Sequence, residues 1–151
     1  MDDDRQSTAP DKQRIAESVR DGMFPEDAAA QMLGMEVESI GPGRASVGMT
    51  VRADMLNGFG ICHGGLIATL ADTAFAYACN SYNEMTVAAG IVVDLLAPAR
   101  EGERLTADAH EVALRGRNGV YDVVVTNQDR KVVAVMRGRS VTKKGETVVS
   151  P

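Results

Sequence analysis

The segment HGGLIATLADTAFAYACNS, residues 63–81, decides the fold of this 151-residue chain. Its apolar residues recur at the helical period over the whole segment, which predicts one long helix. The segment is also almost free of charge. Asp72 is the only Asp, Glu, Lys or Arg between residues 55 and 83, where the overall charged fraction of 25% would give about seven. A helix that is apolar all round is buried on both sides, so the rest of the chain is expected to pack around it.

The two faces of the predicted helix carry different residues. At 100° per residue, one face holds a continuous apolar set that is expected to pack on a sheet: Leu66, Ile67, Leu70, Ala71, Ala74, Tyr77 and Ala78. The opposite face holds Ala68, Asp72, Phe75, Ala76 and Cys79. No Lys, Glu or Arg marks this second face as exposed. A second copy of the chain is therefore expected to cover it; the alternative is that the N-terminal helices do so.

Strands are predicted before and after this helix. Two precede it, at residues 35–40 and 45–51, and Gly41-Pro42-Gly43 between them predicts a hairpin turn. Residues 53–62 predict a loop. Four strands follow the helix, at residues 86–96, 105–114, 120–126 and 132–141. One helix within a run of six strands predicts an α+β fold, with an antiparallel sheet of about six strands and the helix on one face.

The last four strands carry further signals. Residues 86–96 are almost continuously apolar, which predicts a central strand that is buried on both faces. Asn118-Gly119 predicts a tight type I′ turn between the second and third of these strands. Residues 127–130 predict the turn that follows.

The two ends of the chain, residues 1–10 and 145–151, are expected to be flexible tails. Residues 11–144 between them predict a single domain, because a chain of about 150 residues can bury roughly 68–70% of its unfolded surface. Helices are predicted at residues 11–20 and from Pro25 through residue 33.

The composition excludes several classes of function. A net charge of −5 argues against a nucleic-acid-binding surface. The two cysteines, Cys62 and Cys79, form no disulfide framework, and with His63 and His110 they lack zinc spacing, so no zinc site is expected. The N-terminus has no signal-peptide pattern, and no apolar stretch is long enough to span a membrane. A cytoplasmic location without a membrane partner is expected.

The start of the long helix predicts a site for negative charge. The first N–H groups of a helix have no partner within it, and the helix dipole adds to their attraction for anions. Gly64 and Gly65 let a ligand approach this backbone closely, so a thioester carbonyl that becomes an oxyanion could bind here. The alternative is that both glycines serve only tight packing or a turn.

Asp72 is the second candidate. Burial disfavours the charged form of a carboxyl group, and such groups gather at functional sites. The alternative is an Asp that accepts hydrogen bonds from nearby backbone or Thr groups. Asp72 lies about 12 Å along the helix from Gly64, so the two cannot act on one group within a single chain. If they form one site, an antiparallel helix from a second subunit must supply Asp72.

Other residues are weaker candidates. Asn57 precedes the helix and could orient a water or the substrate, or it could simply form a turn before Gly58. His63 could position its neighbours or only begin the helix. Thr73 could support the site or bond back to its own helix. The arginines near the strand ends could meet phosphates or remain solvated: Arg115, Arg117, Arg137 and Arg139.

Two further sequence features do not indicate a catalytic role. Cys62 and His63 are adjacent in sequence, and adjacent side chains seldom face each other, so a nucleophilic cysteine is not favoured. Asp94 is an isolated carboxylate in an apolar strand, and we interpret it as structural or edge-facing.

Two adjoining motifs carry a family resemblance: Asn57-x-x-Gly60-x-x-His63-Gly64-Gly65 and Leu70-Ala71-Asp72-Thr73-Ala74. On these motifs, the chain from about residue 32 to residue 142 resembles the PaaI-type (phenylacetate-degradation) acyl-CoA thioesterases of the hotdog superfamily. The resemblance implies a hotdog fold, in which a curved antiparallel sheet wraps around one long helix. This fold agrees with the order of elements predicted above.

The resemblance also implies a function and residue roles. The Gly64 N–H would polarise the thioester carbonyl, and Asp72 of the opposite subunit would act as general base or nucleophile. Asn57 and His63 would place the water and the thioester, and Thr73 would support the site. The implied substrates are aryl-acetyl or hydroxylated aryl-acetyl CoA, and the implied assembly is a homodimer that pairs into a tetramer. The resemblance implies no metal and no redox cofactor. Arg137, Arg139 and Gly65 are candidates for substrate binding. The alternative is a non-catalytic acyl-CoA-binding or sensor protein of the same fold.

Overall fold

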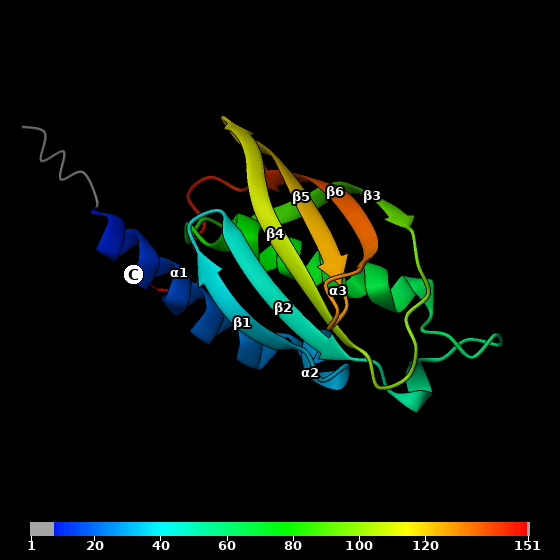
Figure 1. Ribbon diagram of the computed structural model, residues 1–151. Helices are drawn as coiled ribbons and strands as arrows, with labels where there is room; N and C mark the ends of the chain where they lie inside the picture. The colour runs from blue at the N-terminus through cyan, green and yellow to red at the C-terminus, as the bar shows by residue number, and fades with distance from the viewer. Residues whose placement is uncertain (1–7, 151) are drawn as a thin grey trace, which may run out of the picture.

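Six antiparallel strands and one long helix form the centre of the computed structural model, which describes residues 8–150 (Figure 1). The sheet order is β1-β2-β4-β5-β6-β3. The strands are β1 (Glu36–Gly41), β2 (Arg44–Thr50), β3 (Thr86–Leu95), β4 (Arg104–Arg115), β5 (Asn118–Thr126) and β6 (Val132–Thr142). The helix is α3 (Gly64–Asn80), and it contacts all six strands. The predicted α+β hotdog fold is confirmed.

The sheet covers more of α3 than the sequence predicts. Leu70, Ala74 and Ala78 are fully buried, as expected for the face on the sheet. Phe75, which we predicted on the opposite face, is also buried, and its ring lies 5.5 Å from the ring of Tyr121 in β5. Cys79 is buried too. The reason is that the sheet curves around the helix, so a wider arc of α3 meets strands than a flat sheet would reach.

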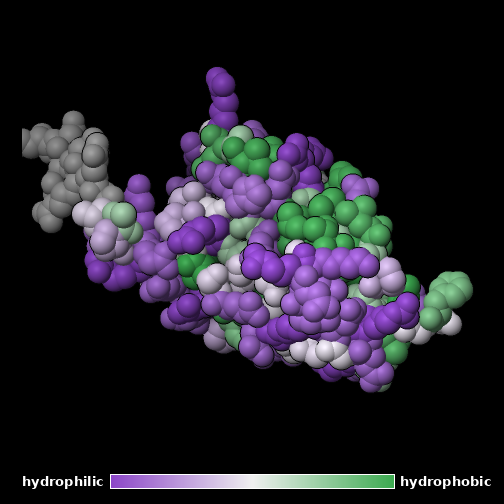
Figure 2. All heavy atoms as spheres, viewed as in Figure 1, coloured by the Kyte–Doolittle hydropathy of each residue, from purple (hydrophilic) through white to green (hydrophobic). Residues whose placement is uncertain are grey.

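The position of β3 corrects a prediction. Residues 86–96 were expected to form a central strand buried on both faces, but β3 pairs only with β6 and forms an edge of the sheet. Val87, Ile91, Val92 and Leu95 on this strand are exposed. Figure 2 shows hydrophobic surface gathered over the β3–β6 side of the molecule. Local sequence cannot distinguish a strand covered by its own chain from one that another chain can cover.

The turn between β4 and β5 also differs from the prediction. Arg115 pairs with Asn118, so the two turn residues are Gly116 and Arg117, and Asn118-Gly119 already belongs to β5. Gly116 has φ +61°, the sign that the first central residue of a primed hairpin turn needs. The hairpin turn at residues 41–43 and the turn at residues 127–130 are confirmed.

The N-terminal elements lie against β1 and α3. Helix α1 (Ala9–Met23) begins earlier than predicted, because Thr8 and Asp11 form a capping box and Pro10 occupies the first turn. The predicted second helix is a 3-10 turn, η1 (Phe24–Glu26), followed by α2 (Ala28–Met32). Residues 1–7 of the predicted N-terminal tail lie outside the described residues. No helix within residues 8–150 is long and apolar enough to cross a membrane.

The segment predicted to be a C-terminal tail is held against the domain. Asn83 Oδ1 accepts hydrogen bonds from the N–H groups of Val148 and Val149, at 3.1 and 2.9 Å. Asn83 Nδ2 donates to the carbonyl of Val149 at 3.1 Å. These bonds tie the end of the chain to the turn that follows α3.

Gly43 joins three elements, and we predict that Gly43→Ala destabilises the fold. Gly43 has φ +70°, and an added Cβ would lie 2.8 Å from the Tyr82 hydroxyl and 3.1 Å from Cβ of Glu111. A strained left-handed residue costs about 1–3 kcal/mol. The free energy of unfolding, measured by denaturant titration, should fall by at least this amount.

The matched control is Gly58→Ala, where an added Cβ would meet nothing within 4 Å. This variant should stay within about 0.5 kcal/mol of the unsubstituted protein. Equal stability of the two variants would contradict the assignment of strain at residue 43.

Candidate active site

A cavity of about 430 Å³ lies at the N-terminus of α3. Its walls come from the loop before the helix, the first turns of the helix, and the end of β3 with the residues that follow it: Asn57, Ile61, Cys62, Gly64, Ile67, Leu95, Leu96, Ala97 and Pro98. No lining side chain is charged. The cavity therefore offers apolar walls with the amide of Asn57 and the helix N-terminus as its polar groups.

The helix start leaves two backbone donors unused. Among the described residues, no group accepts a hydrogen bond from the N–H of Gly64 or Gly65. A Cβ on residue 64 would lie 2.5 Å from Cδ1 of Leu95, the end of an exposed side chain, so a substitution here would require Leu95 to move. Gly64 therefore lets the Leu95 side chain lie directly against the helix start. Its free N–H at the cavity can donate to an oxygen that carries negative charge.

Asn57 forms the loop and also lines the cavity. Its Oδ1 accepts hydrogen bonds from the N–H groups of Phe59, at 2.9 Å, and Ile61, at 3.4 Å. Its own N–H donates to the carbonyl of Ile61 at 2.8 Å. Its Nδ2 makes no hydrogen bond within the part of the chain that the structure describes. Both interpretations of Asn57 are therefore compatible with the structure: one end of the amide forms the turn, and the other remains a donor at the cavity.

His63 and Thr73 do not line the cavity, and Thr73 lies nine residues along α3 from Gly64. His63 is the N-cap residue of α3, its side chain makes no capping hydrogen bond, and its ring is exposed. Its N–H donates to the carbonyl of Met55 at 2.8 Å. Thr73 is 9% exposed, and its hydroxyl donates to the carbonyl of Thr69 at 2.8 Å. Thr73 thus makes the bond back to its own helix that the sequence left as an alternative.

Asp72 lies on the one side of α3 that the sheet does not cover. This half-open stripe consists of Gly65, Ala68, Thr69, Asp72 and Ala76. The N-terminal segment covers only the adjoining side, where Tyr77 donates a hydrogen bond to Asp27. Burial raises the pKa of Asp72, and the negative charge of Asp27 raises it further. No described residue donates a hydrogen bond to the Asp72 carboxyl group.

Within one chain, Asp72 and the helix start are separate. Eight residues of helix place Asp72 about 12 Å from Gly64 along the axis. A group that is held at the Gly64 N–H is therefore out of reach of Asp72 in the same chain.

Arg137 and Arg139, the two arginines named as candidates for substrate binding, lie on the other side of the sheet. Arg137 donates to both carboxylate oxygens of Asp122, at 2.7 and 2.8 Å, on the face opposite α3. Arg139 lies two residues along β6 on the same face. Asp94 is exposed on the edge strand β3, in line with its edge-facing interpretation. A single chain does not bring these residues to the helix start.

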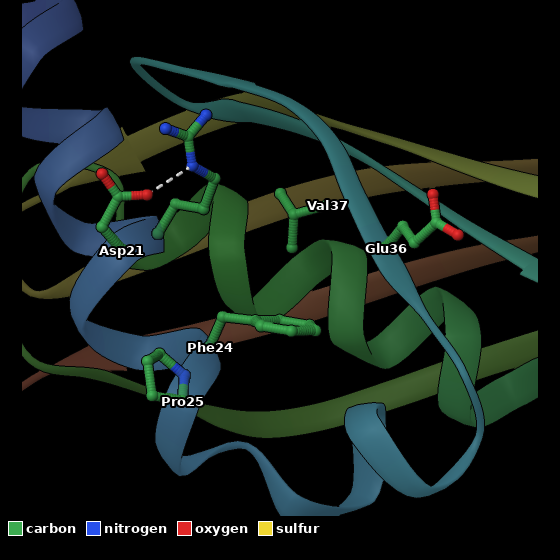
Figure 3. Close-up of a pocket in the computed structure, with 6 residues that line it drawn as sticks. Asp21, Phe24, Pro25, Glu36 and Val37 are labelled. Carbon is green, nitrogen blue, oxygen red and sulfur yellow. Dashed lines mark hydrogen bonds and ion pairs between the residues drawn. The ribbon is translucent and has the colours of Figure 1, made fainter.

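A second cavity, of about 420 Å³, lies between α1, η1 and β1 (Figure 3). Its walls include Phe24, Pro25 and Val37, and its Arg20 is paired with Asp21 at 2.9 Å. None of the candidate residues lines it. We therefore place the candidate site at the N-terminus of α3.

Two other possibilities carry little weight. Burial raises the pKa of the Cys62 thiol, which disfavours the thiolate that a nucleophile needs. Within residues 8–150, no group of three or more His, Cys, Asp or Glu side chains has the geometry to hold a metal ion.

The sequence interpretation missed one wall of the cavity. Leu95 and Leu96 were assigned to a buried central strand, and Ala97 and Pro98 received no role. Pro98, directly after the apolar run, is the signal that the strand has ended and that a loop begins.

Comparisons with known proteins place the chain in a family. Residues 59–134 match the thioesterase superfamily. The acyl-coenzyme A thioesterase PaaI of Escherichia coli (strain K12) is 48% identical over 118 residues, which cover 78% of this chain and 84% of that protein. The structure of the E. coli PaaI protein from the phenylacetic acid degradation operon superposes with a TM-score of 0.87 at 44% identity, covering 89% of this chain and 97% of that chain. A Streptococcus mutans UA159 protein bound to acetyl CoA superposes with a TM-score of 0.72 at 26% identity, covering 75% and 91%.

The raised pKa of Asp72 predicts a pH-dependent effect of Asp72→Asn on stability. A carboxyl group whose pKa is higher in the folded state destabilises that state increasingly as the pH rises above the unfolded-state pKa, and fully once the pH exceeds the folded-state pKa. Asp72→Asn should therefore raise the Tm near neutral pH. The gain should vanish below the ordinary carboxyl pKa of about 3.9, where both states are protonated. Asp129→Asn, at an exposed turn residue, is the control. A gain that is independent of pH would contradict the assignment.

Proposed function

The chain belongs to the thioesterase superfamily as an acyl-CoA thioesterase of the PaaI type, and from that premise we propose a site shared between two subunits. In this site the Gly64 N–H of one subunit holds the thioester oxygen, and Asp72 of the partner subunit performs the attack. The observation that carries the proposal is the separation within α3: an unused backbone donor at an apolar cavity, and an unpartnered carboxyl group about 12 Å away.

Two unpartnered surfaces support a homodimer. The half-open stripe of α3 carries no Lys, Arg or Glu, and β3 presents an exposed apolar edge. An exposed apolar edge strand is a template for pairing with another strand. Pairing of two β3 edges about a two-fold axis would extend the sheet across both subunits and bring the two stripes together. The partner subunit would then cover both the β3 edge and the half-open stripe, so one interface accounts for both unpartnered surfaces.

The two-fold axis has a defined place on α3. If Gly64 of each subunit faces Asp72 of the other, antiparallel helices must cross midway between these residues, at Ala68. Ala68 belongs to the half-open stripe. A small side chain at this point permits the close approach that the shared site requires.

The proposed reaction can follow either of two routes, both of which use the Asp72 carboxylate. The Gly64 N–H stabilises the oxyanion that forms when the thioester carbonyl is attacked. With Asp72 as general base, the carboxylate takes a proton from water, the water oxygen bonds to the carbonyl carbon, and the C–S bond then breaks. The proton that Asp72 took passes to the departing thiolate, and the carboxylic acid and the CoA thiol leave. With Asp72 as nucleophile, its carboxylate oxygen bonds to the carbonyl carbon, the C–S bond breaks and the CoA thiolate leaves, and water then hydrolyses the resulting mixed anhydride.

The remaining candidate residues position the reactants or bind the substrate. The free Nδ2 of Asn57 donates to the water or the thioester oxygen, and His63 borders the entrance at the helix start. Gly65 leaves the second helical N–H open to the substrate, and Thr73 fixes the turn of α3 beside Asp72 through its bond to Thr69. Arg139 is the better candidate for CoA phosphates on the outer face of an assembled dimer of dimers, because Arg137 is already held by Asp122.

The lining of the cavity is suited to an uncharged acyl group. Its walls are apolar, and no charged side chain lines it, so a dicarboxylic acyl group would be buried without a counter-charge. Its volume of about 430 Å³ leaves room for a ring and the adjoining thioester. Aryl-acetyl and hydroxylated aryl-acetyl CoA are the proposed substrates.

The first experiment compares the unsubstituted protein with Asp72→Ala on a panel of acyl-CoA esters, with release of the CoA thiol trapped by a chromogenic reagent. Loss of a positioned base should lower kcat by about 10²–10⁴-fold. Circular dichroism and the Tm report whether the fold is intact. Aryl-acetyl CoA should be the best substrate and succinyl-CoA among the poorest. Near-normal kcat in Asp72→Ala would refute the role of Asp72. Binding of CoA esters without release of thiol would indicate a binding or sensor protein instead.

The shared site has a separate test in mixed dimers. Gly64→Pro removes the proposed N–H at a helix position that accepts proline, and His63, with φ −59° and ψ 128°, already has the backbone that precedes proline. A heterodimer of Asp72→Ala with Gly64→Pro should retain one intact site and about half the activity. A heterodimer of the unsubstituted chain with the Asp72→Ala/Gly64→Pro double variant should retain none.

A site contained within one chain would give the opposite pattern in the two heterodimers. Gly64→Ala is the matched control, because it places the same Cβ against Leu95 and keeps the N–H. The difference in kcat between the Pro and Ala variants isolates the hydrogen bond from the steric effect.

A further inference from the structure

We propose that the core of this protein binds one ordered water molecule at Ser140, in a small cavity where α3 ends against the sheet. Cys79, near the last residue of α3, lines this cavity, so it lies at the opposite end of the helix from Gly64. None of the lining residues belongs to the candidate active site. The water site is therefore separate from the proposed reaction.

Ser140 carries a buried hydroxyl group that has no protein partner. It follows the exposed Arg139 in β6, so the alternation of the strand turns it toward the core, where it is 2% exposed. Its Oγ makes no hydrogen bond with any residue from 8 to 150, and no other buried side-chain oxygen or nitrogen in this range lacks a partner. An unsatisfied buried hydroxyl destabilises the folded state, and native proteins rarely contain one. Ser140 is therefore expected to bind a small polar ligand.

The cavity beside Ser140 has the volume of a single water molecule. It measures about 20 Å³. A water molecule needs about 10–15 Å³ on this measure, so one water fits and an organic ligand does not. Besides Ser140, its polar walls come from Thr86 in β3, Tyr121 in β5 and Thr142 in β6. A cavity with several polar walls holds water, whereas a purely apolar cavity stays dry.

The neighbouring hydroxyl groups already donate their protons elsewhere. Thr86 donates to the carbonyl of Glu84 at 2.9 Å, so Thr142 must be the donor in the 2.9 Å hydrogen bond between the two threonine hydroxyl groups. The Tyr121 hydroxyl donates to a carboxylate oxygen on β4 at 3.1 Å. Each of these hydroxyl oxygens retains a lone pair, but none has a second proton. The cavity therefore offers several acceptors and one free proton, that of Ser140.

A water molecule supplies what this set of groups lacks. Its oxygen can accept the free proton of Ser140, and its two protons can go to the lone pairs of Thr142 and Tyr121. Three hydrogen bonds are about the usual number for a buried water. The water thereby links β5 to β6 beside the last turn of α3, and it satisfies the unpartnered hydroxyl of the described core.

Crystal structures of the unsubstituted protein and of Ser140→Val test the proposal directly. The unsubstituted protein should show one isolated peak of electron density at about 2.5–3.0 Å from Ser140 Oγ and from the hydroxyl oxygen of Thr142 or Tyr121. In Ser140→Val the added methyl group should displace the water, and the peak should be absent. No peak in the unsubstituted protein would overturn the proposal. A Ser140 hydroxyl that is turned to bond a protein group, or a peak that remains unchanged in Ser140→Val, would also overturn it.

The direction of a stability change provides a second test, in solution. Ser140→Ala removes a hydrogen bond to the bound water, so the Tm should fall. Without a bound water, the same variant would remove an unsatisfied hydroxyl group from the core, and the Tm would rise. Ser39→Ala, at an exposed serine of β1, is the matched control and should leave the Tm nearly unchanged. A Tm of Ser140→Ala equal to or above that of the unsubstituted protein would contradict the water site.

Deuteron relaxation dispersion of the solvent, which counts long-lived internal waters, provides a third test. Ser140→Val should hold one such water fewer than the unsubstituted protein, and Ser39→Val should hold the same number. An equal number in Ser140→Val and the unsubstituted protein would overturn the proposal. None of these measurements uses a substrate, so their outcome does not depend on the proposed function.

Discussion

The need to cover an apolar helix on every side governs this structure. Helix α3 carries one charge in 17 residues, so the elements around it must bury most of its surface. The curved sheet buries the largest part, because all six strands contact α3. The N-terminal segment covers the side at Tyr77. The half-open stripe that remains is the side on which Asp72 lies, so the same constraint that builds the core leaves the carboxyl group at a boundary.

Much of the fold could be predicted because its signals are local. The period of residues 63–81 indicated the helix, Gly41-Pro42-Gly43 indicated the first hairpin, and the order of elements indicated an α+β sheet. The errors concern information that is not local. The apolar run in β3 indicates that the strand is suited to burial. It does not indicate whether the same chain or a second chain buries it. Asn118-Gly119 is a strong turn signal, yet the register of β4 with β5 places the turn at Gly116, whose backbone also accepts positive φ.

The site could be predicted only in part. Gly64 and Asp72 were recognisable from the missing charges and from the helix start, and their spacing indicated two chains. The walls from Leu95 to Pro98 were not recognisable, because they reach the helix start only through the return of β3 along the edge of the sheet. Asn57 shows a further limit. Its type and position suggested either a turn residue or a donor, and the structure shows its Oδ1 forming the turn while its Nδ2 makes no hydrogen bond among the described residues.

The exposed edge of β3 has a consequence for the life of the newly made chain. Its ten residues contain no proline and a single charge, Asp94, so an unpaired subunit presents a long apolar edge on which aggregates can grow. If two chains pair through this edge as proposed, the interval between synthesis and pairing is the period of greatest risk. Asp94 then acts as a gatekeeper: a lone charge in an apolar strand penalises stacking into a fibril, where identical charges would repeat every few ångströms. This strand, whose Leu95 also lines the cavity at the helix start, thus combines an edge suited to pairing with a charge that opposes misassembly.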